Sequence, residues 1–276
     1  MSRSSPSWST PAADAAEQEI LLPGGIANRG KVVRIGDTVH RPQRATSPAT
    51  HALLRHLAEV GFDGAPRFLG VDARDREVLS FIPGTTVIAP YPDWALTDET
   101  LVSVARLLRA YHDAVAGFDP SPYTWPDTPP GPFVGELVSH NDPNLDNVVF
   151  RDGRAVALID FDLASPGCGL WDVACAARLW VPLRPAEKIH DSRRDDVFRR
   201  LRVFADGYGL DDPGRSGVLR AVQQNQEWFA WLIGRQIAAG HTAFVRYKKA
   251  ETRMPPEEYS HWLSGIDEPV RAALGV

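Results

Sequence analysis

The segment between residues 139 and 162 constrains the fold more than any other part of the chain. It reads Ser-His-Asn-Asp-Pro-Asn-Leu-Asp-Asn over 139–147, continues through two apolar runs separated by Asp152 and Gly153, and ends in Leu-Ile-Asp-Phe-Asp over 158–162. An Asp-Gly pair between β-rich runs is a strong signal for a hairpin with a two-residue turn. This turn would pair residue 151 with residue 154 and Asn147 with Leu158.

The predicted hairpin brings two oxygen-bearing side chains to one end. Asp160 would lie two residues beyond the partner of Asn147, roughly 7 Å along the strand at about 3.4 Å per residue. An amide oxygen and a carboxylate at that separation can converge on one magnesium ion, which prefers a few hard oxygen ligands from the protein. Asp142 precedes the hairpin and could receive a hydroxyl proton. Asp162 could also reach the metal, whereas we expect Asp146 to face solvent.

An ordinary solvated turn is the simpler interpretation of a segment rich in Asp and Asn. The hairpin and the apolar strand that ends in Asp160 favour a catalytic site instead.

Composition narrows the class of protein. The chain has 276 residues and 43% hydrophobic content, enough for one large or two modest globular units. Its net charge of −5 and the absence of a basic run argue against a nucleic-acid partner. No apolar stretch reaches the length of a membrane span and no signal peptide is evident, so we expect a cytoplasmic protein without a membrane partner. Cys168 and Cys175 are too few for a disulfide framework or a zinc site.

The order of patterns along the chain predicts an α+β protein in two parts. Residues 1–15 are rich in Ser, Pro and Ala and are expected to form a disordered tail. Residues 16–82 carry short β-rich runs and one helical stripe, and Pro83-Gly84 then breaks the chain. Residues 83–276 are mainly helical apart from the hairpin. Their aromatic segment around Trp228 and Trp231 is expected to lie in the core, with a platform for the substrate as the alternative.

Taken together, these motifs resemble the aminoglycoside phosphotransferase and choline kinase-like family, which shares the protein-kinase fold. The matching pieces are Gly24-Gly25-x-x-Asn28, the strand at 38–42, Phe-Ile-Pro-Gly at 81–84, Ala-Tyr-His at 110–112, His140-x-Asp142-x-x-x-x-Asn147, Ile-Asp-Phe-Asp at 159–162 and Trp171-Asp172. The resemblance spans roughly residues 17 to 240. It implies a two-lobed protein-kinase-like fold, with a small antiparallel β-rich N-lobe at 16–82 and a larger, mainly helical C-lobe at 83–276.

Roles in the catalytic region follow from the resemblance residue by residue. Asp142 matches the family's catalytic Asp, and Asn147 and Asp160 match its magnesium ligands. His140 matches a histidine that braces the catalytic loop. Asp172 matches an acidic residue that supports this loop from the following helix.

The nucleotide-binding positions implied by the resemblance come from the first lobe. The segment 80–82 would pair with the base, and the glycine turn would lie over the phosphates, where absent side chains permit close approach. Arg41 stands where the family has a phosphate-binding Lys, and a guanidinium also holds phosphate oxygens well. The residues are Gly24, Gly25, Asn28, Arg41, Ser80, Phe81 and Ile82.

One departure concerns the partner of Arg41. Kinases pair this cation with a helix Glu, but the corresponding helical positions here are Thr50 and His51. Another acid could hold Arg41, or none is needed. If Arg41 points away from the site, Lys31 or Arg34 could replace it.

The resemblance implies a small-molecule kinase. It would transfer the γ-phosphoryl group of ATP or GTP, with Mg2+, to a hydroxyl of an aminoglycoside, a choline-like alcohol, an amino-acid alcohol or a sugar, as a monomer or homodimer. The alternative is a nucleotide-binding pseudokinase or scaffold, against which the retention of Asp142, Asn147 and Asp160 argues. A metal-dependent hydrolase is a third interpretation, but it needs more ligands than a cluster with His140 as its only histidine offers.

Overall fold

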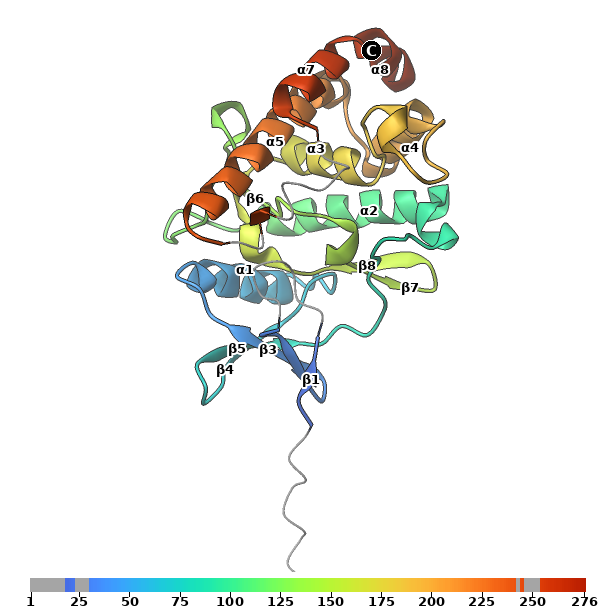
Figure 1. The fold of residues 1–276 in the computed structure, drawn as a ribbon. Helices are drawn as coiled ribbons and strands as arrows, with labels where there is room; N and C mark the ends of the chain where they lie inside the picture. Colours follow the sequence, from blue (N-terminus) through green and yellow to red (C-terminus); the bar gives the residue numbers. More distant parts are fainter. Residues whose placement is uncertain (1–17, 23–29, 242–243, 246–253) are drawn as a thin grey trace, which may run out of the picture.

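The computed structural model describes residues 18–22, 30–241, 244–245 and 254–276. A small antiparallel sheet with one helix lies beside a larger helical part that carries two short two-stranded sheets, β6-β9 and β7-β8 (Figure 1). The strands are β1 (Ile20–Leu21), β2 (Val33–Ile35), β3 (Thr38–Pro42), β4 (Phe68–Val71), β5 (Arg76–Ser80), β6 (Leu137–Ser139), β7 (Val148–Arg151), β8 (Arg154–Leu158) and β9 (Ser165–Gly167). The helices are α1 (Ser47–Glu59), α2 (Asp98–Val115), α3 (Gly169–Leu179), α4 (Val197–Tyr208), α5 (Asp212–Ala238), α7 (Pro256–Ser264) and α8 (Asp267–Leu274). The predicted tail at 1–15 and the positions Gly24, Gly25 and Asn28 lie outside the described residues.

The first sheet places Arg41 at its centre. Its five strands run in the order β1-β2-β3-β5-β4, and β3 pairs with both β2 and β5 in antiparallel fashion. In this register Arg41 lies directly opposite Glu77. Because β3 has neighbours on both edges and α1 lies between the sheet and the helical part (Figure 1), an inward-facing charge on β3 is removed from water and needs a partner.

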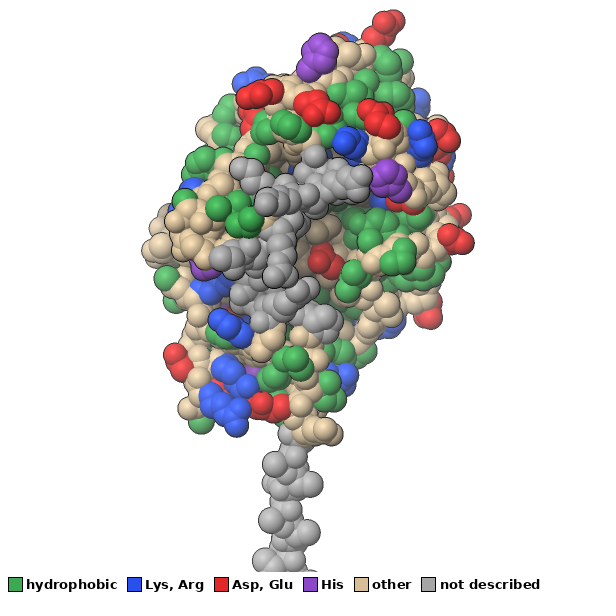
Figure 2. Space-filling view, in the orientation of Figure 1, with side chains coloured by type: hydrophobic (Ala, Val, Ile, Leu, Met, Phe, Trp, Pro, Cys, Tyr) green, Lys and Arg blue, Asp and Glu red, His purple; other side chains and the backbone are tan. Residues whose placement is uncertain are grey.

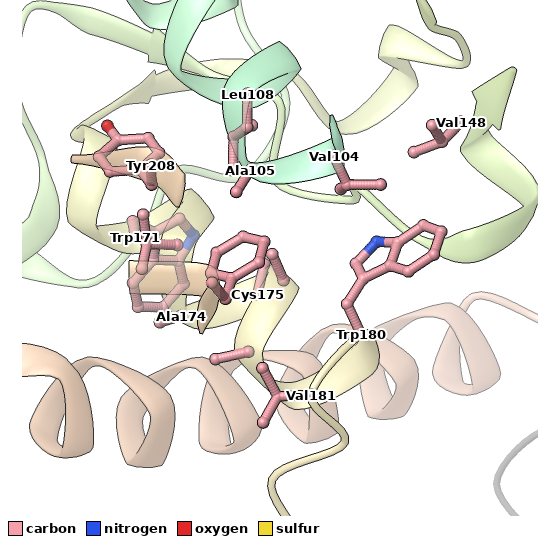
Figure 3. Close-up of a cluster of buried hydrophobic side chains, with 14 of the residues drawn as sticks. Val104, Ala105, Leu108, Val148, Trp171, Ala174, Cys175, Trp180, Val181 and Tyr208 are labelled. Atoms are coloured by element: carbon pink, nitrogen blue, oxygen red, sulfur yellow. The ribbon is translucent and has the colours of Figure 1, made fainter. Parts of the chain in front are cut away.

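The helical part is organised around α2 and α3. Thr97 caps α2 by accepting a hydrogen bond from the Thr100 amide, which satisfies one of the free amides of the first turn. Figure 3 shows side chains of α2, α3 and the segments beside them packed into one core. Its labelled members are Val104, Ala105, Leu108, Val148, Trp171, Ala174, Cys175, Trp180, Val181 and Tyr208. This core fixes α3 against the strands that carry the polar motif.

The turn of the predicted hairpin is present as expected. Arg151 pairs with Arg154, and the two turn residues Asp152 and Gly153 have φ angles of 51° and 72°. Positive φ at both central residues is typical of the turn that suits the twist of a two-residue hairpin, and Asp-Gly favours it.

The register at the other end of the hairpin differs from the prediction. Val148, not Asn147, pairs with Leu158, because the ladder shifts by one residue at Val149 and Phe150. A bulge of this kind sets two residues of one strand against one of its partner. The Ile159 amide donates to the Asn147 carbonyl at 2.9 Å, so Asp160 comes one residue after the partner of Asn147 rather than two.

Gly84 lets the chain pass close to this hairpin. A Cβ atom at Gly84 would lie 2.5 Å from Val149 Cγ1 and 2.6 Å from the Phe150 carbonyl oxygen, and the φ angle is 153°. The following residue, Thr85, forms an isolated bridge with Phe150. The assignment of residues on either side of 82 to two lobes stays a prediction. Among the described residues, no helix is long and apolar enough to cross a membrane.

Candidate active site

The loop between β6 and β7 is held by a carboxylate of α3. Asp172 is fully buried, and its two oxygens accept hydrogen bonds from the His140 and Asn141 amides, each at 2.7 Å. The His112 ring contacts the same carboxylate at 3.0 Å. Asp172 therefore lies where the sequence places a supporting acid, and its effect on catalysis stays a prediction.

Asn141 adopts a backbone conformation that residues other than glycine rarely take. Its φ angle is 67°, and its side-chain nitrogen donates to the Leu163 carbonyl at 2.6 Å and to Ser165 Oγ at 2.8 Å. Such a conformation persists only where the surroundings enforce it. The hydrogen bonds thus join the loop to the segment just after Asp160.

The His140 ring connects the loop to the same segment. Its Nε2 atom lies 3.1 Å from the Ile159 carbonyl oxygen, and its ring centroid lies 4.6 Å from that of Phe161. Burial lowers the pKa of His140, which favours the neutral ring and its donation to the carbonyl. The predicted bracing histidine thus contacts the residues on both sides of Asp160.

Asp142 and Asn147 form a pair at the edge of the site. The Asn147 side-chain nitrogen donates to the Asp142 backbone oxygen at 3.0 Å and to its carboxylate at 3.1 Å. This orientation leaves the Asn147 amide oxygen as the atom available to a cation. Burial raises the pKa of Asp142 to about 7, and the charges of Asp160 and Asp146 act in the same direction.

Arg41 is surrounded by carboxylates. Its Nε atom contacts Glu77 at 2.5 Å, and its two terminal nitrogens contact Asp160 at 3.1 Å and Asp162 at 2.9 Å. Arg44 also pairs with Asp162, at 2.6 Å. Burial alone would lower the pKa of Arg41, but the neighbouring carboxylates outweigh it and raise that pKa. The guanidinium is therefore a fixed positive charge beside Asp160.

Glu77 supplies the partner that the helix lacks. It is 2% exposed, and its second oxygen contacts His51 Nε2 at 2.6 Å. The His51 ring stacks on Phe68 with 3.8 Å between centroids. An acid on β5 and a helix histidine thus occupy the place of a helix Glu. The sequence shows Glu77 as a charged residue within a predicted strand, but it does not show that this strand pairs with β3.

Asp160 and Asn147 fit a magnesium ion better than a metal that needs many protein ligands. Burial raises the pKa of Asp160 to about 6, with Asp162 adding to the rise and Arg41 and Arg44 opposing it. A cation would relieve this crowding of negative charge. Within the described ranges, no three His, Cys, Asp or Glu side chains gather into a metal-binding group. Magnesium suits such a site, because phosphates and water supply most of its ligands.

One cavity of about 510 Å³ joins the two halves of the site. Asp142, Asn147 and Asp160 all line it, and Asp146, which is exposed as expected, lies at its edge. The cavity is also lined by Lys31, just before β2, and by Gln43 and Arg44, just after β3. From α5 it is lined by Phe229, Leu232 and Ile233. The aromatic segment of α5 was evident in the sequence, but that these three side chains line the cavity was not.

Other predicted positions lie away from this cavity. Ser80 ends β5, and the Phe81 amide donates to the Asp37 carbonyl at 2.8 Å, so that amide is already engaged. The contact of segment 80–82 with a base stays a prediction. Trp228 is buried as expected and donates to the Thr128 carbonyl, whereas Trp231 is 49% exposed, so its expected place in the core is wrong.

The visible surface carries charges of both signs. On the face shown in Figure 2, a small group of basic side chains lies at the end formed by the first sheet, and acidic and basic side chains are interspersed elsewhere.

Comparison with known proteins gives consistent likenesses. The model of the phosphotransferase enzyme family matches residues 124–204, which include the whole polar motif. A trifolitoxin immunity protein from Rhizobium leguminosarum bv. trifolii is 35% identical over 212 residues, which are 73% of this chain and 78% of that protein.

Two solved structures illustrate the fold. A choline/ethanolamine kinase family protein from Mesorhizobium loti aligns with a TM-score of 0.54 at 16% identity, covering 96% of this chain and 95% of that one. A GDP and kanamycin complex of APH(2")-IIia aligns with a TM-score of 0.56 at 13% identity, covering 94% and 95%. These likenesses confirm the predicted kinase-like α+β fold.

Proposed function

The chain belongs to the phosphotransferase enzyme family, and we propose that it transfers the γ-phosphoryl group of ATP or GTP to a hydroxyl of a small molecule, with Mg2+ as cofactor. The observation that carries this proposal is the convergence of Asp142, Asn147 and Asp160 on one cavity. A pseudokinase or scaffold has no need of all three side chains in one place, so their convergence favours the enzyme.

Each of these residues has a chemical task in the proposal. Asp142 accepts a hydrogen bond from the acceptor hydroxyl and orients its oxygen towards the phosphorus atom. The Asn147 amide oxygen and the Asp160 carboxylate would hold magnesium, which supplies positive charge to the phosphate oxygens when bound. Because the transition state of phosphoryl transfer is mostly loose, orientation by Asp142 matters more than its basicity.

In this proposal, cationic side chains of the first lobe bind the phosphates of the nucleotide. Arg41 lies within 3.1 Å of Asp160, which places its charge next to the proposed metal ligand. Lys31 and Arg44 line the same cavity. The glycine turn at Gly24 and Gly25 remains proposed for the phosphates.

The proposal includes four classes of acceptor. Aminoglycosides, choline-like alcohols, amino-acid alcohols and sugars all carry the hydroxyl that the reaction requires. The 35% identical relative is named an immunity protein, so we add phosphorylation of a toxin as a candidate role.

Phosphorus NMR with Mg-ATP and a panel of hydroxyl compounds tests the proposal, with ATP turnover to water as a second readout. Asp160→Ala should abolish transfer while the fold is kept. Asp142→Asn should lower kcat by about 10²- to 10⁴-fold, the usual contribution of a positioned base, with little change in nucleotide affinity. Asp152→Asn in the exposed hairpin turn is the control and should behave as wild type. Full activity of Asp160→Ala would remove the metal assignment.

A further inference from the structure

The cavity beside Asp142 has two walls of opposite chemistry. One wall consists of the carboxylates and amide of the catalytic segment, and the other is part of α5. Phe229, Leu232 and Ile233 lie three and four residues apart, so they form one stripe of the helix. Their exposed fractions are 8%, 5% and 4%. An occupant of this cavity therefore meets an apolar surface opposite the reacting groups.

The helix side of the cavity offers no negative charge to a cationic occupant. Its polar members among the described lining residues are Gln236 and His241, and none is acidic. Arg178 stacks on Phe229 with 4.7 Å between its guanidinium carbon and the ring centroid. It donates to Gln226, and its positive charge also acts on Asp142. The charged side chain that contacts Phe229 is therefore positive.

Negative charge on the opposite wall is already compensated in part. Asp162 pairs with both Arg41 and Arg44, and Asp160 pairs with Arg41. Lys31 also lines this wall. Asp142 and Asp146 also line the cavity and can meet an ammonium group there. An acceptor with several ammonium groups would nevertheless hold some of them against the α5 stripe, where no described lining residue is acidic, and losing water there without an ion pair is unfavourable.

We propose that the acceptor is an amphipathic alcohol, which presents a hydroxyl to Asp142 and packs an uncharged apolar body on Phe229, Leu232 and Ile233. A polycationic aminoglycoside has no comparable apolar body for the α5 stripe. The inference rests on the proposed phosphotransfer function, because that function makes the cavity an acceptor site.

Two matched pairs of probes test the chemistry of the occupant. Hexyl and methyl β-D-glucoside differ only in apolar length, and kanamycin and its fully N-acetylated form differ mainly in charge. Binding is measured by calorimetry on the whole chain at physiological salt, with Mg2+ and a non-hydrolysable ATP analogue. The hexyl glucoside should bind at least about tenfold more tightly than the methyl glucoside, because its added methylenes leave water. Kanamycin should bind no more tightly than its N-acetylated form. The reverse order in either pair would overturn the proposal.

Variants of α5 locate the effect. Leu232→Glu should remove the preference for the hexyl chain and favour kanamycin, and Leu232→Ala should weaken the hexyl preference without adding charge. Trp231→Glu is the matched control, since Trp231 is the adjacent residue and is 49% exposed. A hexyl preference that survives both Leu232 variants would overturn the assigned wall.

Nucleotide binding keeps this test separate from the function itself. Binding of Mg-ADP by each Leu232 variant shows that it is folded. If the wild-type chain neither binds Mg-nucleotide nor turns over ATP in a way that depends on Asp160, the phosphotransferase proposal is contradicted. Kanamycin preference in a chain that retains both would contradict only the acceptor class.

Discussion

Replacing Glu77 by Gln should both destabilise the protein and loosen Arg41. Glu77 is 2% exposed and contacts Arg41 at 2.5 Å and His51 at 2.6 Å. Gln keeps the shape but loses the charge. Removing one partner of a buried ion pair costs about 3–5 kcal/mol. Because Arg41 keeps Asp160 and Asp162, we expect the lower end, about 3 kcal/mol. This corresponds to a fall in Tm of about 6–12 °C for a chain of this size.

Thermal unfolding and nucleotide kinetics measure the two effects of Glu77→Gln. The apparent KM for the nucleotide should rise more than kcat falls, because the guanidinium is free to move towards the remaining acids. Glu59→Gln, at an exposed position of α1, is the control and should leave both unchanged. His51→Ala should reproduce part of the loss, and the two changes together should cost less than their sum, since both remove the same contact. A Tm shift below about 2 °C with an unchanged KM would refute the reasoning.

Three further changes test other parts of the site. Arg41→Ala should raise the apparent nucleotide KM. Arg41→Lys should restore it only in part, because Lys brings charge without the planar guanidinium that holds two oxygens at once. KM values of both variants equal to that of the wild type would contradict this. Asp172→Asn should lower the free energy of unfolding by about 1.5–3 kcal/mol and lower kcat, since the loop amides lose a charged acceptor. Unfolding experiments and turnover rates measure the two effects. Gly84→Ala should cost about 1–3 kcal/mol in unfolding experiments, because its Cβ would lie 2.6 Å from the Phe150 oxygen, whereas Gly131→Ala meets no atom within 4 Å and should be neutral.

The hairpin turn could be predicted because it depends on two neighbouring residues. The register of the hairpin could not, because it depends on a contact with a distant segment. Asp152 and Gly153 adopt positive φ angles for reasons contained in two residues. The one-residue shift occurs at Phe150, whose amide and carbonyl both bond to Thr85, far away in the sequence. A pairing between such distant segments leaves no mark in the hairpin itself, so Asn147 was assigned one position too far from Asp160.

The partner of Arg41 was missed for a related reason. Known kinases place it on a helix, where this chain has Thr50 and His51, and the sequence alone left open which other acid could hold Arg41. Glu77 is 36 residues from Arg41 and meets it only because β3 and β5 pair in one particular register. Strand order is set by the whole sheet and cannot be deduced from either strand alone.

The α5 wall escaped prediction because this helix is apolar on more than one side. Trp228 packs in the core and Trp231 faces outward, while Leu232 lines the cavity. Where hydrophobic residues surround a helix, their spacing no longer distinguishes a buried face from one that borders a ligand.

All three nitrogens of the Arg41 guanidinium contact carboxylates. In the proposed function, a phosphate would therefore reach this cation by exchange, and it would gain only the difference between two charge-assisted contacts. A singly charged ligand has little advantage over the carboxylate it would displace, whereas a polyphosphate brings several charges at once. If Arg41 binds phosphate as proposed, Asp160 and Asp162 would thus favour ligands of high charge, and Arg41 would contribute to the choice of ligand as well as to its affinity.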